Sequence, residues 1–203
     1  MCIIRLYVNR QRGGGKGVFI EELSDVNLPS ELYEKIAGKN YIVEEVIVQH
    51  PLLSCINPMS VNTIRIYSVH FKGKTYLTGA TLRMGNGTGV TDNYSKGGFA
   101  AEIDVEHGLV ISRAVSQKGE TAYIHPYSKV PIIGTKIPSW DKVKNMVISA
   151  HNRVPALGYI GWDVVVLEDG SVTFLEANTC AGVELQQHAG LIGKKTCTLL
   201  TYN

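Results

Sequence analysis

The stretch that decides the fold reads Gly161-Trp162-Asp163-Val164-Val165-Val166-Leu167-Glu168-Asp169-Gly170-Ser171-Val172-Thr173-Phe174-Leu175-Glu176-Ala177-Asn178. Two runs rich in β-branched residues flank Glu168-Asp169-Gly170, a tripeptide that favours a turn, so the stretch predicts a β-hairpin. Because side chains alternate between the two faces of a strand, Glu176 and Asn178 share one face, and Asp163 can lie opposite them.

Two carboxylates and an amide oxygen in one patch are hard oxygen ligands, which suit Mg²⁺, an ion that keeps several waters and shares substrate phosphates. Asp163, Glu176 and Asn178 are therefore candidate metal ligands. The alternative is that they are ordinary polar residues on the solvent face of the hairpin.

Composition limits the class of protein. With 203 residues, 44% hydrophobic and 19% charged, the chain is long enough for one domain or two small ones with a real core. A net charge of +2 gives no argument for nucleic acid as a partner, and no apolar run is long enough to span a membrane. The four cysteines are widely spaced, which favours reduced thiols in a cytoplasmic protein over disulfides or a zinc site.

The N-terminal part predicts two strands, Ile3 to Val8 and Val18 to Glu21, joined by a basic, glycine-rich loop. In that loop, Gly13 to Gly17 can aim backbone N–H groups at phosphate oxygens, with Lys16 adding positive charge. The spacing is not that of a Walker motif. The alternative is an exposed hairpin tip.

A strand is predicted from Tyr41 to Val48, after a short helix from Pro29 to Ala37. The backbone edge of this strand could hydrogen-bond a purine, and Gln49 and His50 could reach a sugar. For His50, the commoner alternative is a loop histidine in a cap before Pro51.

A second hairpin is predicted from Ser60 to Val69 and from Thr75 to Met84, and it carries Arg65 and Arg83. Arginine within a strand is costly to bury unless it is paired. Two arginines on adjacent strands therefore suggest an anion site, because the guanidinium fork suits phosphate and carboxylate oxygens. A pair of surface arginines is the alternative.

The remaining elements follow in order. Residues 85–98 form a glycine-rich loop, of a kind that is functional or disordered. Further elements are strands from Phe99 to Asp104 and from Gly108 to Val115, an irregular stretch from Gly119 to Ile133, an amphipathic helix of about three turns with Ser139 as its N-cap, and a helix around 184–188.

The order of these features resembles the ATP-grasp superfamily of carboxylate ligases. The phrases Gln49-His50-Pro51, Asn62-Thr63-Ile64-Arg65 and Gly161-Trp162-Asp163 are similar to the sugar-transfer-associated branch, which itself resembles the glutamate-adding ligases. The resemblance covers nearly the whole chain. It implies an α+β ATP-grasp fold of antiparallel-rich sheets with flanking helices, with 1–48 as part of the small lid subdomain and 49–203 as the C-terminal catalytic subdomain.

The resemblance also implies ATP and Mg²⁺ as cofactors, with a carboxylate and an amine as substrates, in a role connected with polysaccharide or cell-surface biosynthesis. The implied metal ligands are Asp163, Glu176 and Asn178. The implied catalytic residues, which touch phosphate or acyl-phosphate, are Arg65, Arg83 and Asn93. The implied nucleotide-binding residues are Arg5, Gly15, Lys16, Gly17, Glu44, Glu45, Val46, Ile47, Gln49 and His50.

The chain departs from the family pattern in three respects. It lacks the usual N-terminal domain, so we expect either that the chain is truncated or that a partner, such as a missing N-terminal domain or a homo-oligomer partner, supplies the rest. Arg5 stands where many relatives carry lysine, and the tail after the metal hairpin is short. Two other readings therefore remain open: a non-catalytic or partner-dependent nucleotide-binding module, and a structural β-rich domain.

Overall fold

The computed structural model of the chain describes residues 2–6, 18–21, 30, 33–34, 37–38, 41–87, 94 and 97–189. The chain divides into two compact units, residues 1–48 and 49–203. Each unit is described below by itself, and the assignment of the two as lid and catalytic subdomains stays a prediction.

The first unit contains an antiparallel sheet with the strand order β2-β1-β3. Its strands are β1 (Cys2–Leu6), β2 (Val18–Glu21) and β3 (Tyr41–Glu45). All three were predicted; β3 ends earlier than expected, and the part of the first predicted strand after Leu6 lies outside the described residues. Most of the helix predicted from Pro29 to Ala37 lies outside the described residues.

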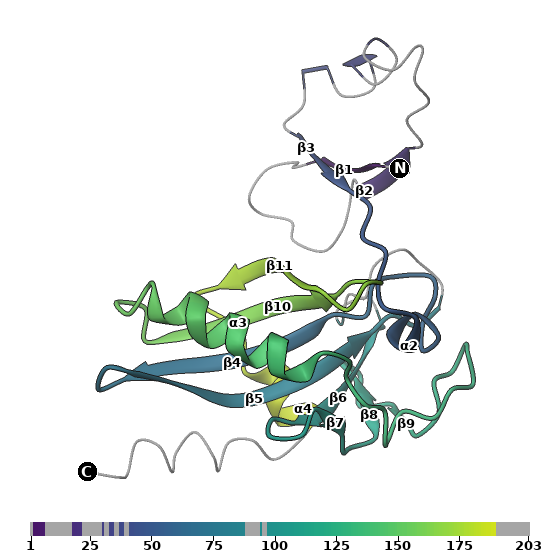
Figure 1. The fold of residues 1–203 in the computed structure, drawn as a ribbon. Helices are drawn as coiled ribbons and strands as arrows, with labels where there is room; N and C mark the ends of the chain where they lie inside the picture. The colour runs from purple at the N-terminus through teal and green to yellow at the C-terminus, as the bar shows by residue number, and fades with distance from the viewer. Residues whose placement is uncertain are drawn as a thin grey trace. The chain divides into compact units, whose positions relative to one another are not determined.

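The second unit is built on an eight-stranded antiparallel sheet with the order β11-β10-β4-β5-β6-β8-β9, in which β7 also pairs with β6 (Figure 1). The elements are α2 (Pro51–Ser54), β4 (Ile64–Phe71), β5 (Lys74–Met84), β6 (Phe99–Asp104), β7 (Leu109–Val110), β8 (Ala114–Ser116), β9 (Thr121–Ala122), α3 (Trp140–Asn152), β10 (Tyr159–Val166), β11 (Val172–Asn178) and α4 (Glu184–Ala189).

Both predicted hairpins of this unit are confirmed. Strands β4 and β5 pair across a turn at Lys72-Gly73, and β10 and β11 pair across the predicted turn at Glu168-Asp169-Gly170. Gly170 has a φ of +76°, in the left-handed region that glycine adopts at no steric cost. A tight turn therefore forms where the sequence placed it.

The predictions for residues 108–133 need correction. The single strand expected from Gly108 to Val115 is two short strands, β7 and β8, and β9 lies inside a stretch expected to be irregular. Backbone bonds from Ile111 N–H to Glu102 O and from Gly134 N–H to Val110 O explain the difference. Strands β7, β8 and β9 form ladders only two residues long, which is too short for an alternating pattern to show in the sequence.

Helix α3 was predicted from apolar residues at helical spacing, and its buried residues include Trp140, Val143 and Val147. Ser139 precedes the helix as expected, but its φ is +52° and its side chain makes no capping bond. Instead, its Oγ donates to Gly170 O at 2.7 Å. The residue therefore ties the start of α3 to the turn of the β10–β11 hairpin.

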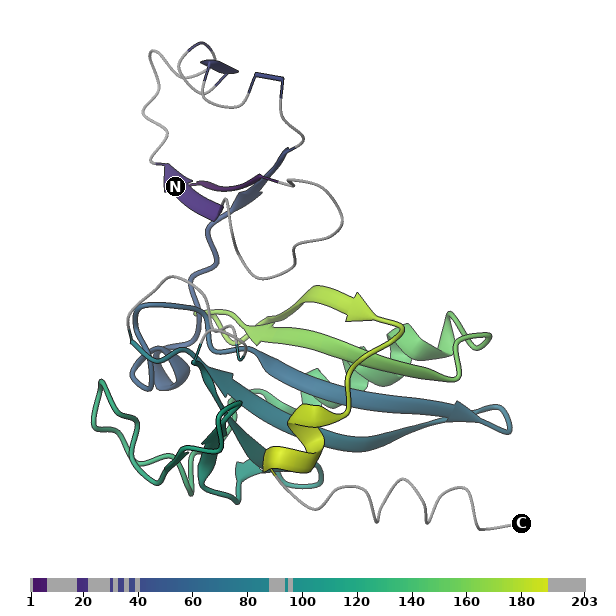
Figure 2. The same ribbon diagram turned by 180° about the vertical axis from the view of Figure 1, so that it is seen from behind.

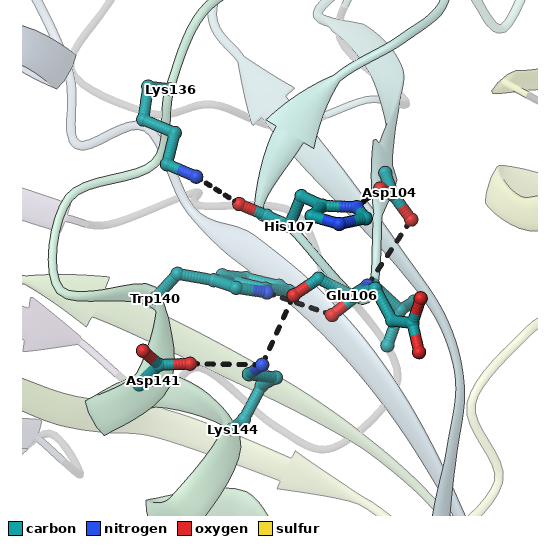
Figure 3. A network of polar contacts seen from close by, with 8 residues as sticks. Asp104, Glu106, His107, Lys136, Trp140, Asp141 and Lys144 are labelled. Carbon is teal, nitrogen blue, oxygen red and sulfur yellow. Dashed lines mark hydrogen bonds and ion pairs between the residues drawn. The ribbon is translucent and has the colours of Figure 1, made fainter.

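A polar network fixes the N-terminal part of α3 against the turn after β6 (Figure 3). Trp140 Nε1 donates to Val105 O at 2.8 Å, and Lys144 Nζ donates to Glu106 O at 3.1 Å. Gly108 lies so close to the Trp140 ring that an added Cβ would be 2.3 Å from it. Glycine is therefore required at this position for the helix to dock.

The sheet of the second unit has two distinct faces. Helix α3 covers one, the apolar face, which carries Ile64, Ile66 and Trp162 of the core (Figure 1). Helix α4 crosses the other side, as the reverse view shows (Figure 2). This second side, the polar face, carries Arg65, Arg83 and Asp163, because these residues alternate with core residues along their strands. Among the described residues, no helix is long and apolar enough to cross a membrane.

Candidate functional site

Two arginines and an aspartate from three neighbouring strands meet on the polar face. Asp163 of β10 lies opposite Arg65 of β4 in the sheet register. Arg65 donates from Nε to Asp163 Oδ1 and from Nη2 to Oδ2, the latter at 2.9 Å, and Arg83 Nη1 donates to the same Oδ2 at 3.0 Å. We call these three residues the arginine clamp.

The arginine clamp is largely shielded from solvent, since Arg65 is 9% exposed and Asp163 is 5% exposed. Burial alone would lower the pKa of Arg65, but its hydrogen bond to Asp163 and the charge of that carboxylate raise the pKa above its ordinary value. Arg65 is therefore a permanent cation. A buried cation of this kind stays stable only while an anion holds it.

Glu176 and Asn178 of β11 lie beside the arginine clamp. The register pairs Asp163 with Glu176 and Gly161 with Asn178, and a bulge follows Asp163. In an antiparallel pair, opposite residues point to the same face, so the three predicted metal candidates share the polar face. Glu176 is exposed, whereas Asn178 is half-buried. The hairpin thus brings these oxygen ligands together, and their metal role stays a prediction.

The ligand atoms of Asp163, Glu176 and Asn178 are of the type that binds Mg²⁺, but Asp163 has few acceptor positions left for it. Carboxylate and amide oxygens are the ligands that this ion prefers. Asp163, however, already accepts three N–H bonds from the two arginines. A carboxylate offers about four acceptor positions, so about one remains on Asp163 for a metal.

Several buried polar atoms on the polar face have no hydrogen-bond partner within the described part of the chain. They are Tyr67 Oη, Thr81 Oγ1 and Asn178 Nδ2. Tyr67 and Thr81 are both fully buried, and burial raises the pKa of Tyr67 to about 12 even though the charge of Arg65 lowers it. Buried polar groups normally have partners, so atoms of this kind mark places where water or a ligand binds.

The segment after Asn178 packs closely onto the same face. An added Cβ at Gly161 would lie 2.4 Å from Ala181 Cβ and 3.4 Å from Arg65 Cδ. Farther along, Gln186 Nε2 of α4 donates to Tyr159 Oη at 3.3 Å. Glycine at position 161 therefore lets this segment lie across the sheet next to the arginine clamp.

Two predicted nucleotide-binding side chains have structural roles. Gln49 Nε2 donates to Ser60 O at 2.9 Å, and its Oε1 accepts from Asn62 N–H at 2.9 Å. Both amide atoms of Gln49 are thus bonded within the second unit, and the expectation that Gln49 or His50 lies near a ribose stays a prediction. His50 caps α2, since Leu52 N–H donates to its Nδ1 at 3.2 Å. This agrees with the alternative interpretation of His50 as a capping histidine before Pro51.

The other predicted residues lie in the first unit or outside the described residues. Arg5 lies in β1, opposite Val18 and Ile42, and Glu44 lies in β3, opposite Ile3. Glu45 ends β3 and is exposed, and Val46 and Ile47, which follow it, are half-buried. Outside the described residues lie Gly15, Lys16, Gly17 and Asn93.

Sequence reasoning missed Tyr67, Thr81 and Gly161 as parts of this face. A signal was present for all three, because each lies two residues from a clamp residue on the same strand and so shares its face. No pattern, however, predicts that a hydroxyl will be buried without a partner. That observation requires the packed structure.

The family model described as "Sugar-transfer associated ATP-grasp" matches residues 18–198. Two similar solved structures are those of the ATP-grasp ligase PsnB, one in complex with a minimal precursor, Mg and ADP, and the other with precursor peptide PsnA2 and AMPPNP. Each has a TM-score of 0.50 and 15% sequence identity, over 98% of this chain. No curated protein matches the chain in sequence.

At this level of identity the likeness concerns the fold, and it confirms the predicted ATP-grasp fold with its antiparallel-rich sheet. The chain spans 45% of the length of the PsnB chains.

Proposed function

Since the chain belongs to the sugar-transfer-associated ATP-grasp family, we propose that it binds ATP with Mg²⁺ and takes part in an ATP-dependent ligase reaction. The observation that supports this most strongly is the arginine clamp beside Glu176 and Asn178. Two guanidinium groups and a set of oxygen ligands on one sheet face are what a metal-bound polyphosphate needs. The similar PsnB structures, one with Mg and ADP and the other with AMPPNP, support the same choice of ligand.

The proposed reaction activates a carboxylate for attack by an amine. The carboxylate oxygen attacks the γ-phosphorus of ATP, giving an acyl-phosphate and ADP. The amine then attacks the acyl carbon, the C–O bond to phosphate breaks, and an amide and inorganic phosphate form. No side chain of the protein needs to become covalently attached in either step.

Each residue in the proposal has a physical role. Arg65 and Arg83 neutralise and orient the transferred phosphoryl group, and Asn93 acts near them. Glu176, Asn178 and Asp163 would hold Mg²⁺, which offsets phosphate charge when it is bound. Because an acyl-phosphate hydrolyses in water, the segment packed over Gly161 contributes by excluding solvent from this face.

The remaining parts of the proposal concern the nucleotide and the biological role. Nucleotide contacts are proposed for the strand edge from Glu44 to Ile47, with Arg5 and the Gly15–Gly17 loop near the phosphates. The family description connects the chain with sugar transfer, and we extend this to an acceptor in polysaccharide or cell-surface biosynthesis.

The test compares ATP with adenosine by isothermal titration calorimetry. Changing Arg83 to Ala removes a phosphate contact but no adenine contact, so ATP affinity in the presence of Mg²⁺ should fall about tenfold or more, with adenosine little changed. Arg153→Ala, at an exposed arginine beyond the end of α3, is the matched control and should change neither. Equal losses for ATP and adenosine in the folded Arg83 variant would contradict the phosphate role.

Ligase chemistry is tested separately from binding. Wild-type protein incubated with Mg²⁺, ATP and a mixture of carboxylates and amines should release ADP over many turnovers only when both substrate classes are present, because with carboxylates alone the reaction stops at the acyl-phosphate. Binding of ATP without any ADP release would instead favour the non-catalytic nucleotide-binding module.

A further inference from the structure

We infer that Gln49 is a positioning residue, which fixes the point at which the proposed base-binding segment joins the strands that carry the two clamp arginines. It acts through a buried group of polar residues, called here the amide knot, that consists of Gln49, Asn57, Ser60 and Asn62. This inference rests on the proposed function and adds to it a residue that acts without touching the nucleotide.

The amide knot joins two phrases of the sequence that resemble the family pattern, Gln49-His50-Pro51 and Asn62-Thr63-Ile64-Arg65. Gln49 Oε1 accepts from Asn62 N–H at 2.9 Å and from Asn62 Nδ2 at 3.2 Å. Gln49 Nε2 donates to Ser60 O at 2.9 Å. The two phrases, whose glutamine and asparagine are 13 residues apart, thus form a single contact.

One side of the amide knot lies where the two arginine strands end. Thr63 directly follows Asn62, and its carbonyl oxygen accepts from Arg83 N–H at 2.8 Å. Arg65 lies two residues after Thr63, in β4. A displacement of Asn62 would therefore move the backbone of both strands that carry the arginines of the clamp.

The other side of the amide knot lies where the second unit begins. Gln49 is the first residue of this unit, and only Val48 separates it from Ile47, the last residue of the proposed base-binding edge. Two residues of chain span at most about 7 Å. The backbone is held here as well, since His50 N–H donates to Val166 O, at the end of β10, at 2.9 Å.

Burial makes the contacts of the amide knot specific. Asn57 and Asn62 are fully buried, and Gln49 and Ser60 are 9% and 7% exposed. The bonds of Gln49 to Ser60 O and to Asn62 N–H fix main-chain atoms, which cannot rotate away as a flexible side chain can. An apolar side chain would fill the same space without fixing a direction, whereas buried polar groups left without partners are costly. The knot therefore favours one arrangement of the backbone.

A fixed spacing matters because a nucleotide is a base and a polyphosphate joined by a short ribose. The contacts to the base and to the phosphates reinforce each other only when the protein presents them at the spacing that the ribose spans. A change of spacing weakens the binding of the whole nucleotide but not of either part by itself. A residue that touches the ribose differs from this, since its loss weakens the nucleoside too.

The experiment compares ATP, adenosine and tripolyphosphate, each with Mg²⁺, by isothermal titration calorimetry for wild type and Gln49→Met. Methionine keeps the length and the unbranched shape of glutamine but makes none of its hydrogen bonds. In Gln49→Met, ATP affinity should fall about tenfold, while adenosine and tripolyphosphate affinities should stay within about twofold of wild type.

The matched control is Asn57→Ala, in the same knot. It removes the bond from Asn57 Nδ2 to Ser60 Oγ but leaves every side-chain bond of Gln49, because these involve only the main chain of Asn57 and Ser60, and Asn62. This variant should bind all three ligands as wild type does.

Three results with a folded Gln49→Met protein would overturn the inference, and circular dichroism checks the fold. The first is an unchanged ATP affinity. The second is an equal loss for ATP and adenosine, which would indicate a direct ribose contact. The third is an equal loss for ATP and tripolyphosphate, which would indicate damage to the clamp itself. Wild type that binds none of the ligands would overturn the proposed function too, whereas wild type that binds ATP, combined with any of the three results, overturns the inference alone.

A second measurement covers the case in which Gln49→Met does not fold. Asn62 N–H donates to a side chain, Gln49 Oε1, and in wild type it should exchange with solvent about a hundredfold or more slowly than in an unstructured peptide. The comparison is Met59 N–H, which donates to Asn57 Oδ1 at 3.3 Å from an exposed residue and should exchange faster. Bound AMPPNP should slow exchange at Asn62 further, because the nucleotide holds both sides of the knot. Exchange at Asn62 that is as fast as in a peptide, or that bound AMPPNP leaves unchanged, would overturn the inference.

Discussion

Arg65 and Ile66 are neighbours in β4, yet they lie on opposite faces of the same sheet and in opposite environments. Ile66 is fully buried in the apolar core beneath α3. Arg65 is nearly as buried, but it is held by a carboxylate and lies near the Tyr67 hydroxyl, for which the described part of the chain offers no hydrogen-bond partner. Apolar packing stabilises one face without directional contacts, whereas charges and hydrogen bonds hold the other. Unused polar groups are tolerated where a ligand binds, and for this reason we propose that the nucleotide binds on the polar face.

The largest expected effect is on the apolar face. Ile66→Ala leaves a cavity between neighbouring core side chains, so the free energy of unfolding should fall by about 2–5 kcal/mol. Urea denaturation measures this loss. Nucleotide affinity of the remaining folded protein should be unchanged, and a large loss of affinity would show that the two faces are not independent.

The next effect is at the glycine beside the arginine clamp. In Gly161→Ala, the new Cβ would lie 2.4 Å from Ala181 Cβ, so the segment after Asn178 must shift. The loss in unfolding free energy should be about 1–3 kcal/mol, and Mg²⁺-dependent nucleotide affinity should fall as well. Gly158→Ala is the matched control, because nothing lies within 4 Å of its Cβ position. Equal effects of the two substitutions would argue against a packed segment over the clamp.

A smaller effect, of opposite sign, is expected at Thr81. Its Oγ1 is buried without a hydrogen-bond partner among the described residues, and valine has nearly the same shape. Thr81→Val should therefore raise the free energy of unfolding by about 1 kcal/mol, measured by urea denaturation. A decrease would show that the hydroxyl has a partner such as an ordered water.

The smallest effect is a pH dependence at the end of β5, where His125 holds the chain after Met84. Its Nε2 donates to Gly85 O at 2.8 Å, and its Nδ1 accepts from Ser128 N–H at 3.3 Å, so the ring is neutral. Burial lowers the pKa of His125 below its ordinary value of 6.5, with the charge of Lys129 adding to this.

The folded state therefore binds a proton less readily than the unfolded state. The stabilisation is complete above pH 6.5 and is lost as the pH falls through the lower pKa of the folded state. Urea denaturation from pH 8 to pH 5 should show this decline in wild type. In His125→Gln the decline should be smaller, and an identical pH profile would exclude His125 as the titrating group.

The sequence predicted those elements whose signal is local. The β10–β11 hairpin follows from β-branched runs around Asp169-Gly170, and α3 follows from apolar residues at helical spacing. Residues 108–133 were predicted less well, because their strand ladders are only two residues long and leave no alternating pattern in the sequence.

The residues of the candidate site were predicted from the sequence, but the contacts between them were not. Residue types identified Arg65, Arg83 and Asp163, but Arg65 and Asp163 are 98 residues apart, and only the strand register brings them together. The polar character of Gln49 was equally plain, yet its sequence context does not reveal that both amide atoms are bonded inside the protein. The sequence identifies the functional group that each residue carries, and the fold determines which partner that group contacts.

The most direct test of the account is a crystal structure of the protein with Mg²⁺ and AMPPNP. The account predicts phosphate oxygens bound to Arg65 and Arg83, with the metal bound to oxygens of Asp163, Glu176 and Asn178. A nucleotide bound away from the polar face, with the arginine clamp intact, would contradict it.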